Sequence, residues 1–225
     1  MAEKQGFIIA IDGPSGVGKT TVSRMLARRL DYRYVDTGAM YRAFALAANE
    51  SGVDLSSEDS LEGFAKRALI VYGEGGTVLI NGKDYTESIR TEEAGRLAST
   101  ASSKKPVRAF LVAYQRTVGR GGSVVMEGRD IGTVVFPDAD MKFFLDAPHD
   151  VRARRRHLEL AGRSPSSEEE TSRKIEERDR EDTSRENSPL KMAGDAIFID
   201  TGGITAEEVV EKMLAAIRAR FKGIA

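Results

Sequence analysis

The chain of 225 residues contains no cysteine and only two histidines, His149 and His157. Without cysteine, disulfide scaffolds, thiolate nucleophiles and Cys-ligated metal sites are excluded, and two histidines cannot build a multi-histidine metal site. We expect both histidines on helix surfaces or at helix caps. The lack of cysteine is compatible with a reducing compartment, so we expect a cytoplasmic protein.

Long apolar runs and an excess of one charge sign are also missing. The apolar stretch at residues 7–11 is short and leads directly into Asp12 and Gly13, which is the layout of neither a signal peptide nor a membrane span. Lys and Arg number 34 against 35 Asp and Glu. This balance gives no basic footprint of a nucleic-acid binder, so we expect neither a nucleic-acid partner nor a membrane partner.

What the sequence does contain is the pattern of an α/β protein with a parallel sheet. The run Phe7-Ile8-Ile9-Ala10-Ile11 predicts a strand buried on both faces, and the apolar spacing from Lys19 to Leu30 predicts a helix. Further buried strands are predicted at 123–126, 141–145 and 196–199, another strand at 33–35, and further helices at 39–51, 106–119 and 206–221.

Two segments depart from this alternation. Short strand-like pieces at 69–72, 77–80 and 83–85 are separated by Gly73–Gly76 and by Asn81-Gly82, which predicts a small antiparallel insert. Residues 152–186 are dense in both charge signs and poor in large apolar residues, so we expect exposed helices that contribute little to the core.

The loop between the first strand and the first helix is Gly13-Pro14-Ser15-Gly16-Val17-Gly18-Lys19-Thr20, the full phosphate-binding-loop (P-loop) pattern. Glycines let backbone N–H groups converge on phosphate oxygens, and the helix N-terminus faces them with its positive end. We expect Lys19 to reach the β and γ phosphates and the Thr20 hydroxyl to ligate Mg²⁺. The loop alone leaves GTPases, ATPases and small-molecule kinases open.

Charged residues follow other strands at the same sheet edge. Arg42 lies one turn into a predicted helix after a strand, and Arg129 and Asp130 directly follow another strand. Arg178, Asp182 and Arg185 are spaced by four and three residues, which predicts one face of a helix. Taken alone, that spacing is more typical of a solvated salt-bridge stripe.

Together these blocks, in this order, resemble the bacterial-type cytidylate kinases of the nucleoside monophosphate kinase family. The resemblance rests on IDGPSGVGKTT, DTGAMYR, GRDIGTVVFPDA, the Arg178, Asp182, Arg185 spacing and Ser188-Pro189-Leu190, and it extends over nearly the whole chain. It implies a three-layer P-loop NTPase fold in one domain, 1–225. Within that domain it implies a nucleoside-monophosphate (NMP) binding insert at about 63–100 and a helical lid at about 152–186.

The same resemblance implies roles for individual residues. ATP would bind to Gly13, Pro14, Ser15, Gly16, Val17, Gly18, Lys19, Thr20 and Thr21, with Arg154–Arg156 in the lid. The acceptor's phosphate would be held by Arg42 and Arg129, with Thr37 and Tyr41 beside the nucleotide. The base would face Ser99, Arg108 and Asp130, with Ser102 or Ser103 as alternatives to Ser99. Arg178, Asp182 and Arg185 would reach ribose and phosphates, and the catalytic set would be Lys19, Arg129, Arg178 and Arg185.

The chemistry of cytosine agrees with these residue types. Cytosine has an N4 amine donor and acceptors at N3 and O2, which a carboxylate and the donors of Arg and Ser complement. We therefore expect a monomeric Mg²⁺-dependent kinase that converts ATP and CMP or dCMP to diphosphates and prefers CMP to UMP. The alternatives are a small P-loop kinase for UMP, AMP or a non-nucleotide acceptor, and a P-loop nucleic-acid module using Arg152–Arg156.

Overall fold

The computed structural model describes residues 6–160 and 166–221, and its chain divides into two compact units. The P-loop unit consists of Met1–Val35, Gly119–Ser184 and Ser188–Ala225. The Asp36–Val118 unit also includes Arg185–Asn187. No helix within the described ranges is long and apolar enough to cross a bilayer.

A five-stranded sheet forms the centre of the P-loop unit. Its strands are β1 (Ile8–Asp12), β2 (Arg33–Asp36), β6 (Val124–Gly128), β7 (Met141–Asp146) and β8 (Ile197–Asp200). They run in the order β2-β6-β1-β7-β8, and β1 pairs in parallel with both β6 and β7, as β7 does with β8. All five residues of β1 are buried, which confirms the strand predicted from its uninterrupted apolar run.

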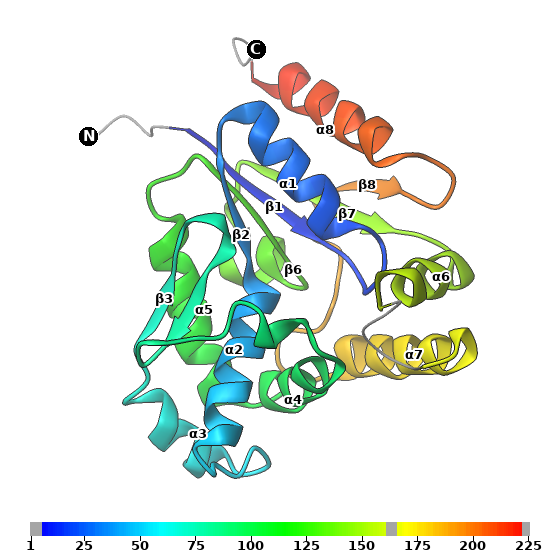
Figure 1. The fold of residues 1–225 in the computed structure, drawn as a ribbon. Coiled ribbons are helices and arrows are strands. Elements are labelled where there is room, and N and C mark those ends of the chain that lie inside the picture. Colours follow the sequence, from blue (N-terminus) through cyan, green and yellow to red (C-terminus); the bar gives the residue numbers. More distant parts are fainter. Residues whose placement is uncertain (1–5, 161–165, 222–225) are drawn as a thin grey trace. The chain divides into compact units, whose positions relative to one another are not determined.

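Helices α1 (Lys19–Leu30) and α8 (Ala206–Arg220) lie side by side over one face of this sheet (Figure 1). Ile9, Ile11 and Phe143 from the strands pack with Leu26 of α1 and Met213 of α8 in one buried cluster. Thr205 begins α8 with a capping box: its hydroxyl accepts from the Glu208 amide, and the Glu208 carboxylate accepts from the Thr205 amide. Both helices were predicted from their apolar spacing.

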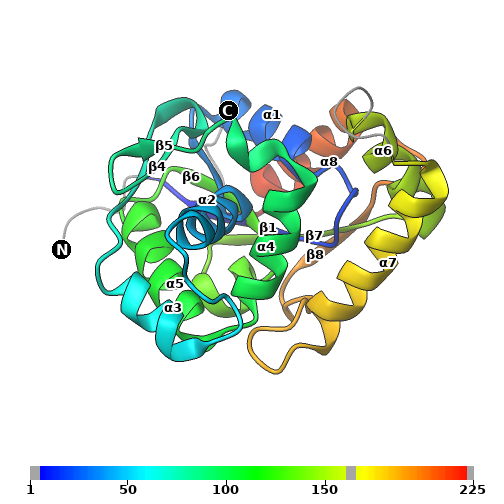
Figure 2. The ribbon, with the colours of Figure 1, turned by 60° about the horizontal axis from the view of Figure 1, so that its bottom comes forward.

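Helices α6 (His149–Leu160) and α7 (Glu168–Ser184) lie next to each other in the same unit (Figures 1 and 2). The ring Nε2 of His149 lies 2.9 Å from the Ser172 hydroxyl and links the two helices. Most of the side chains are exposed, as their charge density predicted, but Arg152 and Asp182 are buried at 8% and 7% exposure. Their burial was not predicted, because it depends on two ion pairs between distant parts of the chain, Arg152 with Asp179 and Arg129 with Asp182.

The Asp36–Val118 unit combines helices with a small antiparallel sheet. Its helices are α2 (Thr37–Glu50), α3 (Glu58–Ala65), α4 (Glu92–Ser102) and α5 (Lys105–Gly119, whose last residue lies in the other unit). Its strands β3 (Ile70–Tyr72), β4 (Val78–Ile80) and β5 (Lys83–Asp84) pair in the order β3-β4-β5, which confirms the predicted antiparallel insert. Short 3₁₀ turns lie at Glu74–Gly76 and Ser88–Arg90. Helices α2 and α4 pack together, and Phe44 contacts Phe64 and Phe110 in the interior.

Candidate active site

The P-loop leaves the sheet directly beside Arg129. In the parallel register Asp12 of β1 is opposite Gly128 of β6, so Gly13 and Arg129 follow the strand ends side by side. On the other side of β1 the chain passes so close to β7 that a Cβ on Gly13 would lie 2.2 Å from the Leu145 carbonyl oxygen. Only glycine fits there, which explains the first glycine of the motif.

Lys19 is the first residue of α1 and is buried at 7% exposure. The residue before it, Gly18, has a left-handed backbone with φ of 88° and ends the loop. The Lys19 amine donates to the carbonyl oxygens of Gly13 at 2.8 Å and Pro14 at 2.6 Å, so the side chain folds back across the loop. Thr20 and Thr21, next on the helix, are exposed. The Lys19 amine, the Thr20 hydroxyl and the N-terminus of α1 therefore all lie at the end of the P-loop.

The charge of Lys19 is set by its surroundings in the P-loop unit. Burial lowers the pKa of Lys19 to about 7, and the positive charges of Arg129 and Arg178 lower it further, while Glu127 and Asp182 act in the opposite direction. Glu127 is buried at the end of β6 and accepts a hydrogen bond from the Tyr34 hydroxyl. The positive charges of Lys19, Arg129 and Arg178 therefore act on one another, and such a group of cationic side chains favours the binding of a polyanion.

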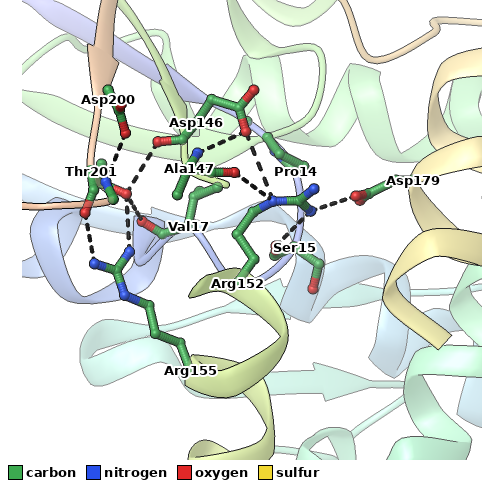
Figure 3. Close-up of polar contacts among 12 residues, drawn as sticks. Pro14, Ser15, Val17, Asp146, Ala147, Arg152, Arg155, Asp179, Asp200 and Thr201 are labelled. Atoms are coloured by element: carbon green, nitrogen blue, oxygen red, sulfur yellow. Dashed lines mark hydrogen bonds and ion pairs between the residues drawn. The ribbon is translucent and has the colours of Figure 1, made fainter. Parts of the chain in front are cut away.

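Side chains of α6 and of the residue after β8 hold the P-loop in place (Figure 3). The Arg152 guanidinium donates to the carbonyl oxygens of Ser15 at 3.3 Å and Ala147 at 3.0 Å, and it pairs with Asp179 of α7. The Thr201 hydroxyl donates to the Val17 carbonyl oxygen at 3.0 Å. Ser15 and Val17 flank Gly16, so the loop is tied to α6, to α7 and to the end of β8.

Arg155, one turn after Arg152, donates to the Thr201 hydroxyl at 3.0 Å and to the Thr201 carbonyl at 2.7 Å (Figure 3). Its neighbours differ, because Arg154 is exposed and Arg156 pairs with Glu159 at 2.8 Å. Of the three arginines expected in the lid, Arg155 therefore holds Thr201, whose hydroxyl in turn bonds to the Val17 carbonyl oxygen of the P-loop.

Arg129 and Asp182 form a largely buried ion pair. The Arg129 Nε lies 2.8 Å from the Asp182 Oδ2, and the two side chains are 18% and 9% exposed. Burial by itself opposes the charge of Arg129, but Asp182 foremost among the nearby carboxylates raises its pKa above the ordinary value. Asp130 is buried at 4% exposure directly after Arg129. Arg129, which directly follows β6, and Asp182 of α7 thus meet beside the P-loop.

The third member of the predicted helix face lies elsewhere. Helix α7 ends at Ser184, so Arg178 and Asp182 share a helix but Arg185 does not, and Arg185 belongs to the other unit. The expectation of three residues on one helical face was wrong for Arg185. The helix ends there because the chain turns back through Ser188, which has φ of 53°, and the Leu190 amide bonds to the Asp182 carbonyl oxygen at 2.7 Å.

The Asp36–Val118 unit contains the other predicted acceptor residues. On α2, the Arg42 guanidinium pairs with Asp36 at 3.0 Å, while Asp36 also caps the helix by accepting from the Ala39 amide, and Thr37 is buried. The Arg108 guanidinium on α5 lies over the Tyr41 ring, 5.6 Å from its centroid, which is a cation–π contact.

The last turn of helix α4 provides a further contact of Arg108. Its Nη1 donates to the Ser102 carbonyl oxygen at 3.3 Å. The Ser102 hydroxyl donates to the Ser99 carbonyl oxygen, and the Ser103 hydroxyl donates to that of Thr100. Tyr41, Arg108 and the end of α4 are therefore brought together within this unit.

Known proteins are similar to the chain over nearly its whole length. A match to the cytidylate kinase family spans residues 9–219. Cytidylate kinases of Geobacter sp. strain M21 and Citrifermentans bemidjiense are 48% and 49% identical to the chain, covering 98% and 97% of it and 97% and 95% of their own lengths. The cytidylate kinase of Geobacillus kaustophilus is 45% identical over 97% of the chain and 99% of its own length.

The chain belongs to the cytidylate kinase family. The resemblance inferred from the sequence motifs is therefore confirmed. Membership of the cytidylate kinase family makes the chain a kinase of the nucleoside monophosphate type, and the observed sheets agree with the predicted P-loop kinase fold.

Solved structures share this fold at low identity. A shikimate kinase from Bacteroides thetaiotaomicron has a TM-score of 0.51 at 14% identity, covering 94% of this chain and 98% of its own. A protein from Eubacterium ventriosum has a TM-score of 0.54 at 13% identity, covering 96% and 99%. At such identities the likeness concerns the fold alone, while membership of the cytidylate kinase family rests on the closer sequence relatives.

The sequence analysis did not predict several residues that lie near the P-loop of this cytidylate kinase family member. Asp12, Glu127, Arg152, Asp179 and Thr201 all contact or influence the P-loop or its neighbours. Asp12 and Glu127 could have been found, because a charged residue that ends an otherwise apolar buried strand has to be paired. Arg152 and Asp179 had no such signal within a segment rich in both charges.

Proposed function

We propose that the chain transfers the γ-phosphoryl group of ATP to CMP, and also to dCMP, to give ADP and the cytidine diphosphate. The observation that carries the proposal is the buried Lys19 amine, which folds across the P-loop and whose pKa is lowered to about 7 by burial and then by the positive charges of Arg129 and Arg178. Such a cluster stabilises bound phosphates rather than a neutral ligand. The cytidine-specific part is supported by the family of the chain.

ATP is assigned to residues 13–21. The amides of the loop and the N-terminus of α1 would bind phosphate oxygens, and Lys19 would exchange its two carbonyl partners for the β and γ phosphates. Arg152 and Thr201 hold the carbonyl oxygens of Ser15 and Val17, so the amides of the loop are left to face the ligand. Residues 152–186 would act as the lid over ATP.

A divalent cation, with Mg²⁺ the best candidate, fits the donor set beside Lys19. Thr20 is exposed at the start of α1, and its hydroxyl is the oxygen ligand that a hard cation prefers. When bound together with ATP, Mg²⁺ neutralises charge on the phosphate oxygens. Thr20 would hold it, and Lys19 with the neighbouring arginines would complete the neutralisation.

The acceptor is assigned to the residues that the cytidylate kinase motifs imply. Arg42 and Arg129 would bind its phosphate, with Thr37 and Tyr41 beside the nucleotide. Ser99, Arg108 and Asp130 would recognise the cytosine, because a carboxylate accepts from the N4 amine and Arg and Ser donate to N3 and O2. Arg178, Asp182 and Arg185 would contact the ribose and phosphates.

No general base is needed for this transfer, since the acceptor phosphate is already an anionic nucleophile. Catalysis would then depend on in-line alignment of the two substrates and on stabilisation of the equatorial oxygens by Lys19, Arg129, Arg178 and Arg185. We further propose that the protein acts as a monomer in the cytoplasm, with free nucleotides rather than nucleic acid as partners.

The test is a panel of acceptors assayed for ADP release with Mg-ATP: CMP, dCMP, UMP, AMP and shikimate. We expect strong turnover with CMP and dCMP and weaker turnover with UMP. Uracil reverses the polarity at N3 and position 4 and leaves buried groups unpaired, at a cost of about 1–3 kcal/mol each. Strongest turnover with AMP or shikimate would contradict the proposal. Turnover that ignores the acceptor would favour a P-loop ATPase instead.

A further inference from the structure

Asp12 is a buried carboxylate that takes no part in the steps proposed above. It is the last residue of β1, directly before the P-loop, and only 5% of its surface is exposed. Its Oδ1 accepts from the Ile131 amide and its Oδ2 from the Gly132 amide, each at 2.8 Å. Both oxygens are thus bound by consecutive backbone amides on a segment more than a hundred residues away in the sequence.

Those two amides begin the turn that follows Asp130. Residues Ile131–Val135 form one π-helical turn, in which the amides of Val134 and Val135 donate to the Asp130 carbonyl oxygen at 2.8 and 3.2 Å. The backbone of Asp130 is therefore held by its own turn on one side and, through the next peptide units, by Asp12. Asp12 therefore joins the end of β1, directly before the P-loop, to the backbone that follows Asp130.

A carboxylate is the side chain that this contact requires. Two adjacent N–H groups need two acceptor oxygens and no donor, whereas the amide of Asn would direct an NH₂ group at one of them. Burial raises the pKa of Asp12 to about 6, even though the amides of Gly132 and Ile131 favour the charged form. The fold keeps the carboxylate despite this unfavourable burial.

The turn also packs against Asp12 and Lys142. A Cβ on Gly132 would lie 3.4 Å from the Asp12 Oδ2, an ordinary contact distance, and 3.0 Å from the Cδ of Lys142. The contact with Asp12 is therefore made by the two backbone amides and does not itself require glycine at 132.

We propose that Asp12 is a positioning residue for base recognition: it fixes Asp130 at a set distance from the P-loop. This inference rests on the role proposed for Asp130 in reading the cytosine N4 amine. Asp12 does not touch the substrate in this scheme. It acts by holding the backbone that presents Asp130, so its loss would change acceptor selectivity and not only stability.

The experiment compares Asp12→Asn with the unaltered full-length protein. We measure kcat/KM for CMP and for UMP at saturating Mg-ATP, and the midpoint of thermal unfolding. We expect the CMP/UMP ratio of kcat/KM to fall about tenfold, because a displacement of about 1 Å in a recognition group costs that much or more. An unchanged ratio, with or without a lower unfolding temperature, would overturn the proposal.

Asp140→Asn is the matched control. Asp140 accepts a backbone hydrogen bond from Ile8 at 2.8 Å, at the opposite end of the same strand. Its replacement should lower the unfolding temperature without changing the CMP/UMP ratio. A ratio that falls equally in Asp140→Asn would show that general loosening of β1 is sufficient, and would overturn a specific role for Asp12.

Two further variants separate the possible failures. If Asp130→Asn leaves the ratio unchanged, the role of Asp130 fails and the inference fails with it. If Asp130→Asn lowers the ratio and Asp12→Asn does not, only the role of Asp12 is wrong. Should Asp12→Asn not fold, Asp12→Glu keeps the charge but lengthens the side chain by one methylene, which displaces the two oxygens from the amides of Ile131 and Gly132. A lower ratio there supports the proposal, and an unchanged ratio overturns it.

Discussion

The two units hold their arginines in different ways. In the P-loop unit, Arg129 pairs with Asp182, 53 residues away, and Arg152 pairs with Asp179, 27 residues away. In the Asp36–Val118 unit, Arg42 pairs with Asp36 and Arg108 bonds to the Ser102 carbonyl, each only six residues away. The first pair of contacts requires the folded sheet and α7, whereas the second pair forms within one helix and its cap or within one helix–turn–helix segment.

This difference has a functional meaning under the proposed assignment. Arg129, assigned to the phosphates, and Arg152, which holds the P-loop, are fixed by long-range contacts, which give the preorganisation that electrostatic catalysis needs. Arg42 and Arg108, assigned to the acceptor alone, are fixed locally, so changing one of them should leave the ATP side intact. The predictions below test this division, from the largest expected effect to the smallest.

The largest effect is expected at Lys19. Lys19→Met should reduce kcat about a thousandfold with every acceptor, because it removes preorganised positive charge from the transferring phosphate. Steady-state ADP release with CMP and with UMP measures it. Lys212→Met, an exposed lysine on α8 of the same unit, is the control and should behave like the unaltered protein. A loss confined to one acceptor would contradict the division between the units.

A smaller and more selective effect is expected at Arg42. Arg42→Ala should raise KM for CMP about 10- to 100-fold, the value of one charge-assisted hydrogen bond of about 1.5–3 kcal/mol. The KM for ATP should not change, since Arg42 bonds within its own unit. Arg67→Ala removes an exposed arginine of the same unit that bonds only locally to the Gly63 carbonyl, and serves as the control. A similar rise in the KM for ATP would contradict the expectation that Arg42 leaves the ATP side intact.

The smallest effect is a proton taken up when ATP binds. Burial lowers the pKa of Lys19 to about 7 in the free protein, and the negative charge of bound phosphates raises it again. At about pH 8 the free amine is largely neutral and the bound amine is charged, so binding takes up a proton; at about pH 6 the amine is charged in both states and uptake vanishes.

Calorimetric titration of Mg-ATP in buffers of different ionisation enthalpy, without acceptor, measures this uptake. Lys19→Arg stays charged at both pH values and provides the control. Equal uptake at about pH 8 by Lys19→Arg and the unaltered protein would assign the proton to another group.

The local parts of this structure were predictable from the sequence. The strand, loop and helix at residues 8–30 were predicted from the apolar run, the glycines and the helical spacing, and the antiparallel insert from Asn81-Gly82 and Gly73–Gly76. Helix α4 was missed although Ala94, Leu97, Ala98 and Ala101 are buried at helical spacing. Three of these four residues are alanines, so the apolar face is real but small, and the pattern was weak.

The long-range parts were not predictable. Nothing in the sequence around Arg152 distinguishes it from Arg154 or Arg156, yet only Arg152 is buried and bonded to the P-loop. Its partner Asp179 lies among many acidic residues of α7. Which of several similar charges becomes buried is decided by how α6 and α7 pack, and a single sequence does not contain that information.

Two glycines of the P-loop, Gly13 and Gly16, are constrained by the backbone of β7 and of α6. A Cβ on Gly13 would collide with β7, and one on Gly16 would lie 2.5 Å from the Arg152 carbonyl oxygen of α6. A Cβ on Gly18 would meet nothing within 4 Å, and only its φ of 88° disfavours other residues. Loss of activity after substitution at the first two glycines would therefore report a displaced scaffold, and Gly18 is the position at which loop conformation can be studied without steric interference.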